Sequence, residues 1–184
     1  RALGPPRRLP LLEMCLPALK AMSAKQYRVF KDTLVGLIQA DQRTELHEWC
    51  LFQLLRHYLD PEFMQVRSSR PRHRRLQKVD YHLRVALSVL AWEGGGDPEA
   101  HFRRGADELG FPEMQLMPRE QSQVATFSRA VQELADCYPL LKPKILKALV
   151  STASYDGDIN PQEREIVISI AAVMDCPVPA LDSV

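Results

Sequence analysis

Four residues near the C-terminal end carry side-chain oxygens at a spacing that could hold a hard cation. They are Asp156, Asp158, Asn160 and Glu163. Counted back from Glu163 as the last ligand of an EF-hand calcium loop, Asp156 takes position five and Asn160 position nine. Thr152 stands at position one, where such a loop needs a carboxylate. A bound calcium-like ion is therefore one interpretation of this stretch.

The same stretch can also be interpreted as the joint between two helices. Asn160 can cap the second helix, and Pro161 suits its first position because a missing N–H costs nothing there. Glu163 stands where a capping box needs a carboxylate. Gly157 can supply the left-handed conformation that often follows a helix C-terminus. These roles account for the stretch without a metal, so the helix joint is the leading interpretation.

The joint occurs twice along the chain. Sliding the sequence on itself by about 115 residues places Asp41 on Asp156 and Glu48 on Glu163, and the flanking apolar positions stay in register. Apolar residues three and four positions apart on either side of an acidic turn are typical of two helices packed as a hairpin. The sequence therefore predicts a duplicated helical hairpin. The residues predicted to form the two joints are Asp41, Glu48, Asp156, Gly157 and Glu163.

A basic segment spans residues 67–78 and contains no acidic residue. Its six positive charges are Arg67, Arg70, Arg72, Arg74, Arg75 and Lys78. Such a run is usually a solvated loop, but it could also contact anionic lipid head groups, phosphate or an acidic partner. The segment lacks aromatic residues for base stacking, and the net charge of the chain is only +1, which argues against a nucleic-acid partner.

The histidines and cysteines do not form a catalytic pattern. His47 and Glu48 begin like the zinc-protease helix His-Glu-x-x-His, but Leu51 stands where the second histidine is needed. The four cysteines are widely spaced with no Cys-x-x-Cys pair, which favours a reducing compartment. No serine lies in a Gly-x-Ser-x-Gly elbow. We therefore expect this chain to be non-catalytic and to need no cofactor of its own.

Composition and periodicity predict an all-α fold. Of the 184 residues, 46% are hydrophobic and 26% charged, as in a globular protein, and the alternation that marks strands is absent. We expect about seven or eight helices in one compact domain, cut from a longer protein because the chain does not start with methionine. No apolar run approaches the roughly 18 residues that span a bilayer. The predicted parts are a linker (1–10), an N-terminal half (11–66), the basic loop (67–78), connecting helices (79–138) and a C-terminal half (139–184).

The second joint, Tyr-Asp-Gly-Asp-Ile-Asn-Pro-Gln-Glu (155–163), resembles the Ala-Asp-Gly-x-Ile/Val-x-x-x-Glu signature of TerB-like domains. These are all-helical modules named for a tellurite-resistance protein. The first copy, at 38–49, is similar to the same signature without its glycine. Together with Leu-Pro-Leu-Leu-Glu (9–13) and the helix order, the whole chain resembles the soluble C-terminal region of bacterial membrane-bound zinc metallopeptidases of the HtpX type.

This resemblance implies two TerB-like halves on the cytoplasmic side of the bacterial inner membrane, with zinc held only in the upstream part of the parent protein. The leading hypothesis is a regulatory or protein-interaction domain whose partner is another protein or the parent catalytic domain. One alternative is a TerB-type stress or tellurite-response module that binds a divalent ion. Another is a domain that docks on an anionic membrane surface through the basic segment.

Overall fold

A computed structural model describes residues 4–39, 44–66 and 70–177, and these residues form eight α-helices without any strand. The prediction of an all-α fold with seven or eight helices is confirmed. Within the described residues, no helix has both the length and the apolar composition that crossing a bilayer requires. The chain divides into two compact units, residues 1–68 and 69–184, whereas the sequence analysis expected one compact domain. The boundary lies inside the basic segment.

The first unit contains three helices, which are α1 (Pro5–Lys20), α2 (Ala24–Gln39) and α3 (Leu46–Phe63). Both α1 and α2 pack on α3. The helix α1 starts inside the stretch 1–10 that was expected to be a linker, so that expectation is wrong from Pro5 onwards. Pro5 and Pro6 occupy the first helical turn, where proline is tolerated. The helix also continues through Pro10 and Pro17, which lie two turns apart and are both exposed, so water can bond the carbonyls they leave free.

A buried carboxylate links α2 to the end of α3. Asp60 accepts hydrogen bonds from the Tyr27 hydroxyl at 2.6 Å, from Lys31 Nζ at 2.6 Å and from Arg56 Nε at 3.3 Å. Its residue is only 8% exposed. Burial opposes ionisation, but the donors outweigh it and hold the pKa of Asp60 below its usual value. The ionised carboxylate therefore stabilises the fold of the first unit. Its contacts hold Asp60 in place directly before Pro61, and α3 continues through that proline.

We expect Asp60→Ala to lower the free energy of unfolding of the first unit by about 3 kcal/mol, because it leaves the Tyr27 hydroxyl buried without an acceptor. Asp32→Ala, at an exposed position of α2, is the matched control and should change it by less than about 0.5 kcal/mol. Urea unfolding followed by Trp49 fluorescence in a Trp92→Phe background measures both. Because the pKa of Asp60 is lowered, this stabilisation is present above the usual aspartate pKa and is lost as the pH falls through the lowered value. Equal effects of the two substitutions would contradict the assignment.

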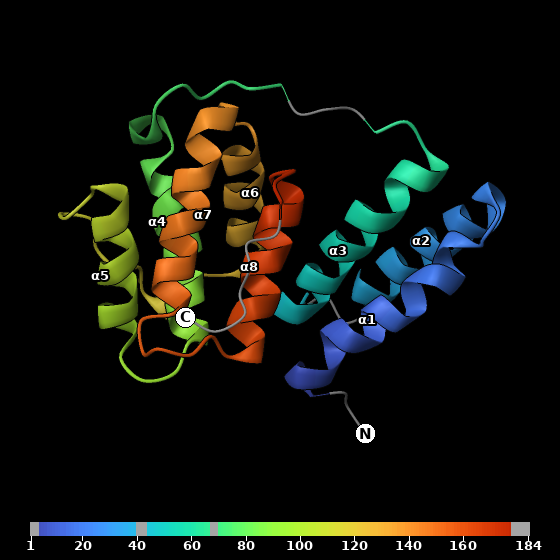
Figure 1. Cartoon of the computed structure of the whole chain (residues 1–184), viewed down its shortest axis with the longest axis horizontal. Coiled ribbons are helices and arrows are strands. Elements are labelled where there is room, and N and C mark those ends of the chain that lie inside the picture. Colours follow the sequence, from blue (N-terminus) through green and yellow to red (C-terminus); the bar gives the residue numbers. More distant parts are fainter. Residues whose placement is uncertain (1–3, 40–43, 67–69, 178–184) are drawn as a thin grey trace. The chain divides into compact units, whose positions relative to one another are not determined.

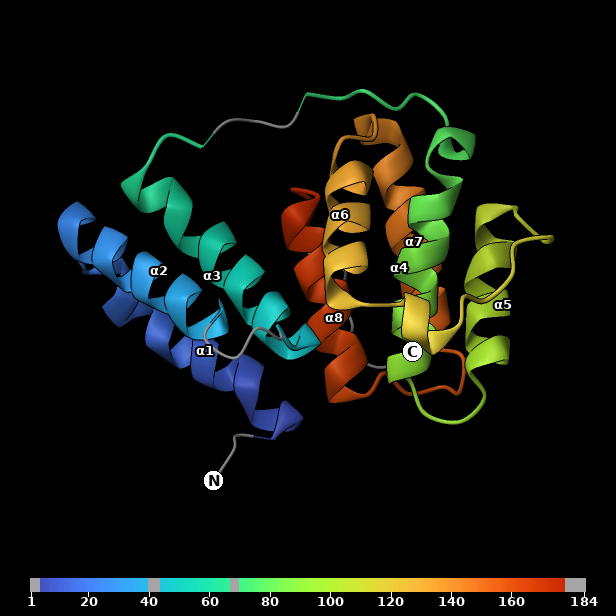
Figure 2. The same cartoon turned by 180° about the vertical axis from the view of Figure 1, so that it is seen from behind.

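The second unit is a five-helix bundle. Its α-helices are α4 (Asp80–Glu93), α5 (Pro98–Leu109), α6 (Val124–Ala135), α7 (Lys142–Ala153) and α8 (Pro161–Val173), with short 3-10 helices η1 (Leu76–Lys78), η2 (Arg119–Gln121) and η3 (Pro139–Leu141). The helix α4 is central, since it packs on the other four and is buried from Val85 to Ala91. Figures 1 and 2 show α4 and α6 on one side and α7 between α5 and α8 on the other.

The ends of α5 follow the signals in its sequence. The Asp97 side chain caps the first turn by accepting from Glu99 N at 3.0 Å, and Pro98 takes the first helical position. Gly110 ends the helix in the left-handed region, with φ of 82°. Inside α5, Gly105 lies so close to α7 that a Cβ atom on it would overlap the Thr152 hydroxyl. A glycine is therefore required where these two helices meet.

Candidate functional site

The joint between α7 and α8 holds the predicted cation ligands and the predicted caps together. Asn160 Oδ1 accepts the backbone N–H groups of Gln162 and Glu163, both at 2.9 Å. Glu163 Oε2 in turn accepts Asn160 N at 2.9 Å, which closes the capping box. Gly157 has a φ of 98°, as a left-handed residue of the turn. Asn160 and Glu163 thus have the capping roles that their sequence positions suggest, whereas Gly157 lies in the turn three residues beyond Ser154, the C-cap of α7, and does not end that helix.

The four candidate calcium ligands do not converge on one point through free oxygens. Asp156 and Asp158 are exposed, whereas Asn160 Oδ1 and Glu163 Oε2 are engaged in capping. Over residues 4–39, 44–66 and 70–177, no group of three or more His, Cys, Asp or Glu residues has an arrangement that could hold a metal ion. Capping accounts for the contacts at this joint, and the calcium site stays a prediction.

Glu163 has a second oxygen that faces a buried histidine from α5. Glu163 Oε1 lies 3.7 Å from His101 Nδ1, and both side chains are 1% exposed. This oxygen has no hydrogen-bond partner. His101 Nδ1 lies 2.9 Å from the Thr152 carbonyl oxygen, which can only accept, so Nδ1 carries the proton. Burial raises the pKa of Glu163 to about 7, with a smaller contribution from Asp156, against the lowering effects of Asn160 N–H and His101.

Gly94, at the C-terminal end of α4, leaves room for Glu163 and His101 because it has no side chain. A Cβ on Gly94 would lie 2.6 Å from Glu163 Oε1 and 3.2 Å from two atoms of the His101 ring. Tyr155, which is 50% exposed, covers the ring from the α7–α8 turn at a centroid distance of 5.1 Å. His101 was not identified as a site residue from the sequence. Its position one and two turns before Gly105 and Leu109 places it on the buried stripe of α5, and that spacing could have identified it.

The first joint has a matching cap at its described end. Glu45 and Glu48 form a capping box at the start of α3, with Glu48 Oε2 accepting Glu45 N at 2.9 Å. Glu48 thus plays the role in α3 that Glu163 plays in α8, 115 positions later. Asp41 and Gln42 lie outside the described residues. The correspondence between the two joints is therefore seen at the starts of their second helices.

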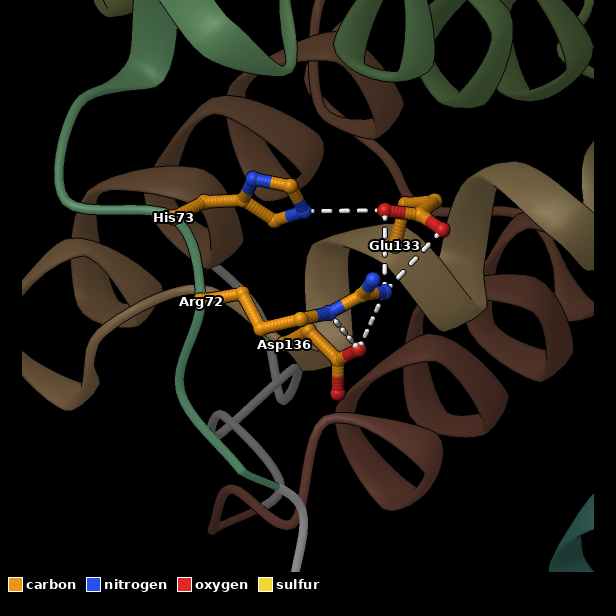
Figure 3. A network of polar contacts seen from close by, with 4 residues as sticks. All are labelled: Arg72, His73, Glu133 and Asp136. Carbon is orange, nitrogen blue, oxygen red and sulfur yellow. Dashed lines mark hydrogen bonds and ion pairs between the residues drawn. The ribbon is translucent and has the colours of Figure 1, made fainter.

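Part of the basic segment is tied to α6 by ion pairs (Figure 3). Arg72 Nη2 lies 2.6 Å from Asp136 Oδ2 and 3.2 Å from Glu133 Oε1, and His73 Nε2 lies 2.8 Å from Glu133 Oε2. The hydrogen bond from His73, together with the charge of Arg72, holds the pKa of Glu133 below its usual value. Sequence reasoning could not foresee these pairs, because their members lie about 60 positions apart.

The remaining cations of the segment differ from Arg72. Arg74 Nε donates to the Tyr138 hydroxyl at 2.9 Å, and its guanidinium lies 5.2 Å from the centre of that ring. Arg70, Arg75 and Lys78 are exposed and form no ion pair with any described residue. Arg67 lies outside the described residues. The structure thus divides the predicted docking residues into one anchor and several outward charges.

His47 and two of the cysteines were considered for catalysis. His47 Nδ1 lies 3.1 Å from Glu45 Oε2 at the start of α3, and Leu51 follows where a zinc-protease helix has its second histidine. Cys50 and Cys137 are buried, and burial raises the pKa of the Cys137 thiol to about 11, which keeps it protonated. Neither thiol is placed to act as a nucleophile.

Comparison with known proteins gives no significant match for this chain, whether to a family model, to a curated protein or to a solved structure. No relative supplies a function. The evidence for one comes from the residues of the two units and from the faces that they leave uncovered.

Proposed function

We propose that the chain is a non-catalytic, all-helical protein-interaction module built from two TerB-like halves, and that it regulates a membrane-bound zinc metallopeptidase of the HtpX type. Its partner is the catalytic part of that peptidase, on the cytoplasmic side of the bacterial inner membrane. The zinc ligands belong to that catalytic part. The module contributes a binding surface rather than a reaction.

The repeated hairpin supports the duplication. The helices α3 and α8 begin 115 positions apart, at Leu46 and Pro161. Each second helix starts with a capping box. A polar contact also joins the two segments of each pair, between residues that correspond at offsets of 115 and 114 positions. In the first pair Tyr27 donates to Asp60, and in the second Lys142 donates to the Met174 carbonyl at 2.6 Å.

The uncovered face of α1 is the observation that carries the interaction function. This helix of 16 residues has no buried residue, although its half-buried Leu12, Leu16 and Leu19 share the side that faces its own unit. The other side exposes apolar residues at positions i, i+3, i+4 and i+7, which are Leu11, Met14, Cys15 and Ala18. Leu11 is 47% and Met14 78% exposed. A continuous apolar stripe of this kind marks a surface that binds another protein.

The experiment is a binding measurement between this chain and the detergent-solubilised catalytic part of the peptidase that carries it. We expect Leu11→Lys and Met14→Lys each to raise the dissociation constant by at least about 10-fold, because each replaces an apolar side chain that the partner would bury. Leu37→Lys, at an exposed leucine of α2, is the matched control and should leave the dissociation constant unchanged. Equal affinities for all variants, or an equal loss in the control, would refute the proposal.

A second measurement addresses the non-catalytic character. The purified chain with added zinc should not cleave casein. Cleavage that is lost on replacing His47 or Glu48 would show that this chain itself holds the reaction, and the proposal would then fail.

A further inference from the structure

Two segments of the second unit lie side by side at the end of the bundle where α6 ends and α7 begins (Figure 1). Tyr138 N donates to the His73 carbonyl at 2.9 Å, and the backbone N–H groups of Arg72 and His73 both reach the Asp136 carbonyl. His73 and Cys137 form an isolated parallel bridge. The backbone from residue 70 to 75 therefore runs against residues 136–138 as a fixed strap rather than as a free loop.

The ion pairs of Figure 3 orient the charges of this strap. Arg72 and His73 point towards Glu133 and Asp136, and these contacts hold the segment against the end of α6. The cations on either side are left without a carboxylate partner among the described residues. They are Arg70, Arg74, Arg75 and Lys78, and all four are exposed. The anchor thus holds four positive charges on one end of the second unit.

An apolar side chain projects from the same end. Leu140 lies in η3, which follows Tyr138 directly, and it is 92% exposed, the highest value among the exposed large apolar side chains of the described residues. The Leu141 N–H donates to the Tyr138 carbonyl at 2.9 Å, so the turn that carries Leu140 is fixed to the residue that Arg74 contacts. A leucine that no described residue covers, close in the chain to cations that have no described carboxylate partner, fits a surface that is anionic outside and apolar beneath.

We propose that this end of the second unit, defined by Arg70, Arg74, Arg75, Lys78 and Leu140, docks on the surface of an anionic lipid bilayer. The cations contact the anionic head groups, and Leu140 enters the boundary with the acyl chains. A bilayer is favoured over an acidic protein because the cations are spread along a strap around a single projecting leucine, an arrangement that needs no shape-complementary partner. Docking through the second unit is separate from partner binding through α1.

Co-sedimentation of the whole chain with mixed phosphatidylserine and phosphatidylcholine vesicles tests the proposal. We expect binding that weakens steeply with salt and is absent on pure phosphatidylcholine vesicles. The triple variant Arg70→Glu, Arg75→Glu and Lys78→Glu should lose at least about 100-fold in partitioning, since each basic residue near the surface contributes roughly 5-fold. Leu140→Ser should lose roughly 10-fold, because it removes the buried apolar area.

The control carries the same change of charge at other exposed positions, as Lys25→Glu, Arg28→Glu and Arg129→Glu. It should keep vesicle binding, and all variants should keep the thermal unfolding of the parent chain. An equal loss in the control, binding to neutral vesicles or insensitivity to salt would overturn the proposal. So would binding of soluble polyglutamate without binding of vesicles, which would instead assign this end to an acidic protein. The test of partner binding uses other residues and detergent, so failure of either proposal is recognised separately.

Discussion

Replacing Gly105 by alanine is expected to lower the free energy of unfolding of the second unit by about 3 kcal/mol, because the added methyl has no space where α5 meets α7. It would overlap the Thr152 hydroxyl and lie 2.9 Å from Leu87 Cδ2 and 3.1 Å from the Ala148 carbonyl oxygen. The carbonyl belongs to the backbone of α7, so the contact can be relieved only by moving one helix away from the other. The helix propensity of alanine, which would favour the substitution by about 1 kcal/mol, is too small to compensate.

Gly36 supplies the matched control. Gly36 lies within α2, and a Cβ atom added there would have no atom from outside its own helix within 4 Å. Gly36→Ala should therefore stabilise the first unit slightly. Urea unfolding of the second unit, followed by Trp92 fluorescence in a Trp49→Phe background, measures the effect of Gly105→Ala. Adding Thr152→Ala should recover part of the lost stability, because the hydroxyl is the nearest obstacle. Stability of Gly105→Ala equal to that of the parent chain would show that α5 and α7 do not approach this closely.

The features that the sequence predicted well are those whose cause lies within one turn of chain. Asp97 and Gly110 bound α5 through contacts to residues two to four positions away. The cap of α8 likewise depends only on Asn160 to Glu163. Apolar spacing identified the buried faces as well, since Ile166 and Ile170 lie in the core of the second unit. Local backbone chemistry and periodicity suffice for such features.

The features that the sequence did not predict depend on residues far along the chain. A proline such as Pro61 usually ends a helix, but Asp60 is held by Tyr27 and Lys31 and the helix continues to Phe63. Arg72 was interpreted as an outward charge, although Glu133 and Asp136 bind it. His101 was overlooked because its partners come from α7 and α8. In each case a tertiary contact overrides what the local sequence indicates.

The second unit should become less stable as the pH rises from about 4.5 to above 7, by an amount on the order of 3 kcal/mol. The cause is Glu163, whose pKa is raised to about 7 in the folded chain from 4.5. A group with a raised folded pKa binds its proton more tightly when folded. Its stabilising contribution is therefore complete below pH 4.5 and is lost as the pH rises through 7. Above that pH a carboxylate with one unpartnered oxygen lies buried beside His101.

Glu163→Gln removes this titration while its side-chain carbonyl can still accept Asn160 N–H in the capping box. We expect the variant to lose little stability between pH 5 and pH 8. The difference in the free energy of unfolding between the variant and the parent chain, called the gap below, should therefore shift in favour of the variant by on the order of 3 kcal/mol across that range. Urea unfolding at each pH, followed by Trp92 fluorescence in a Trp49→Phe background, measures the gap. Because the comparison is made at each pH, the titration of groups that do not interact with Glu163 affects both chains equally.

Glu48→Gln is the matched control, since Glu48 occupies the same capping position in α3 but is only half-buried. Its gap from the parent chain, followed by Trp49 fluorescence in a Trp92→Phe background, should stay constant over the same pH range. If the gaps of both variants change equally with pH, the dependence comes from capping-box carboxylates in general and not from burial at Glu163. A constant gap for Glu163→Gln would mean that the carboxyl is as well solvated in the folded chain as in the unfolded one. Burial of its second oxygen and its neighbours His101 and Asp156 distinguish position 163 from position 48, so the difference between the two pH dependences measures their combined effect.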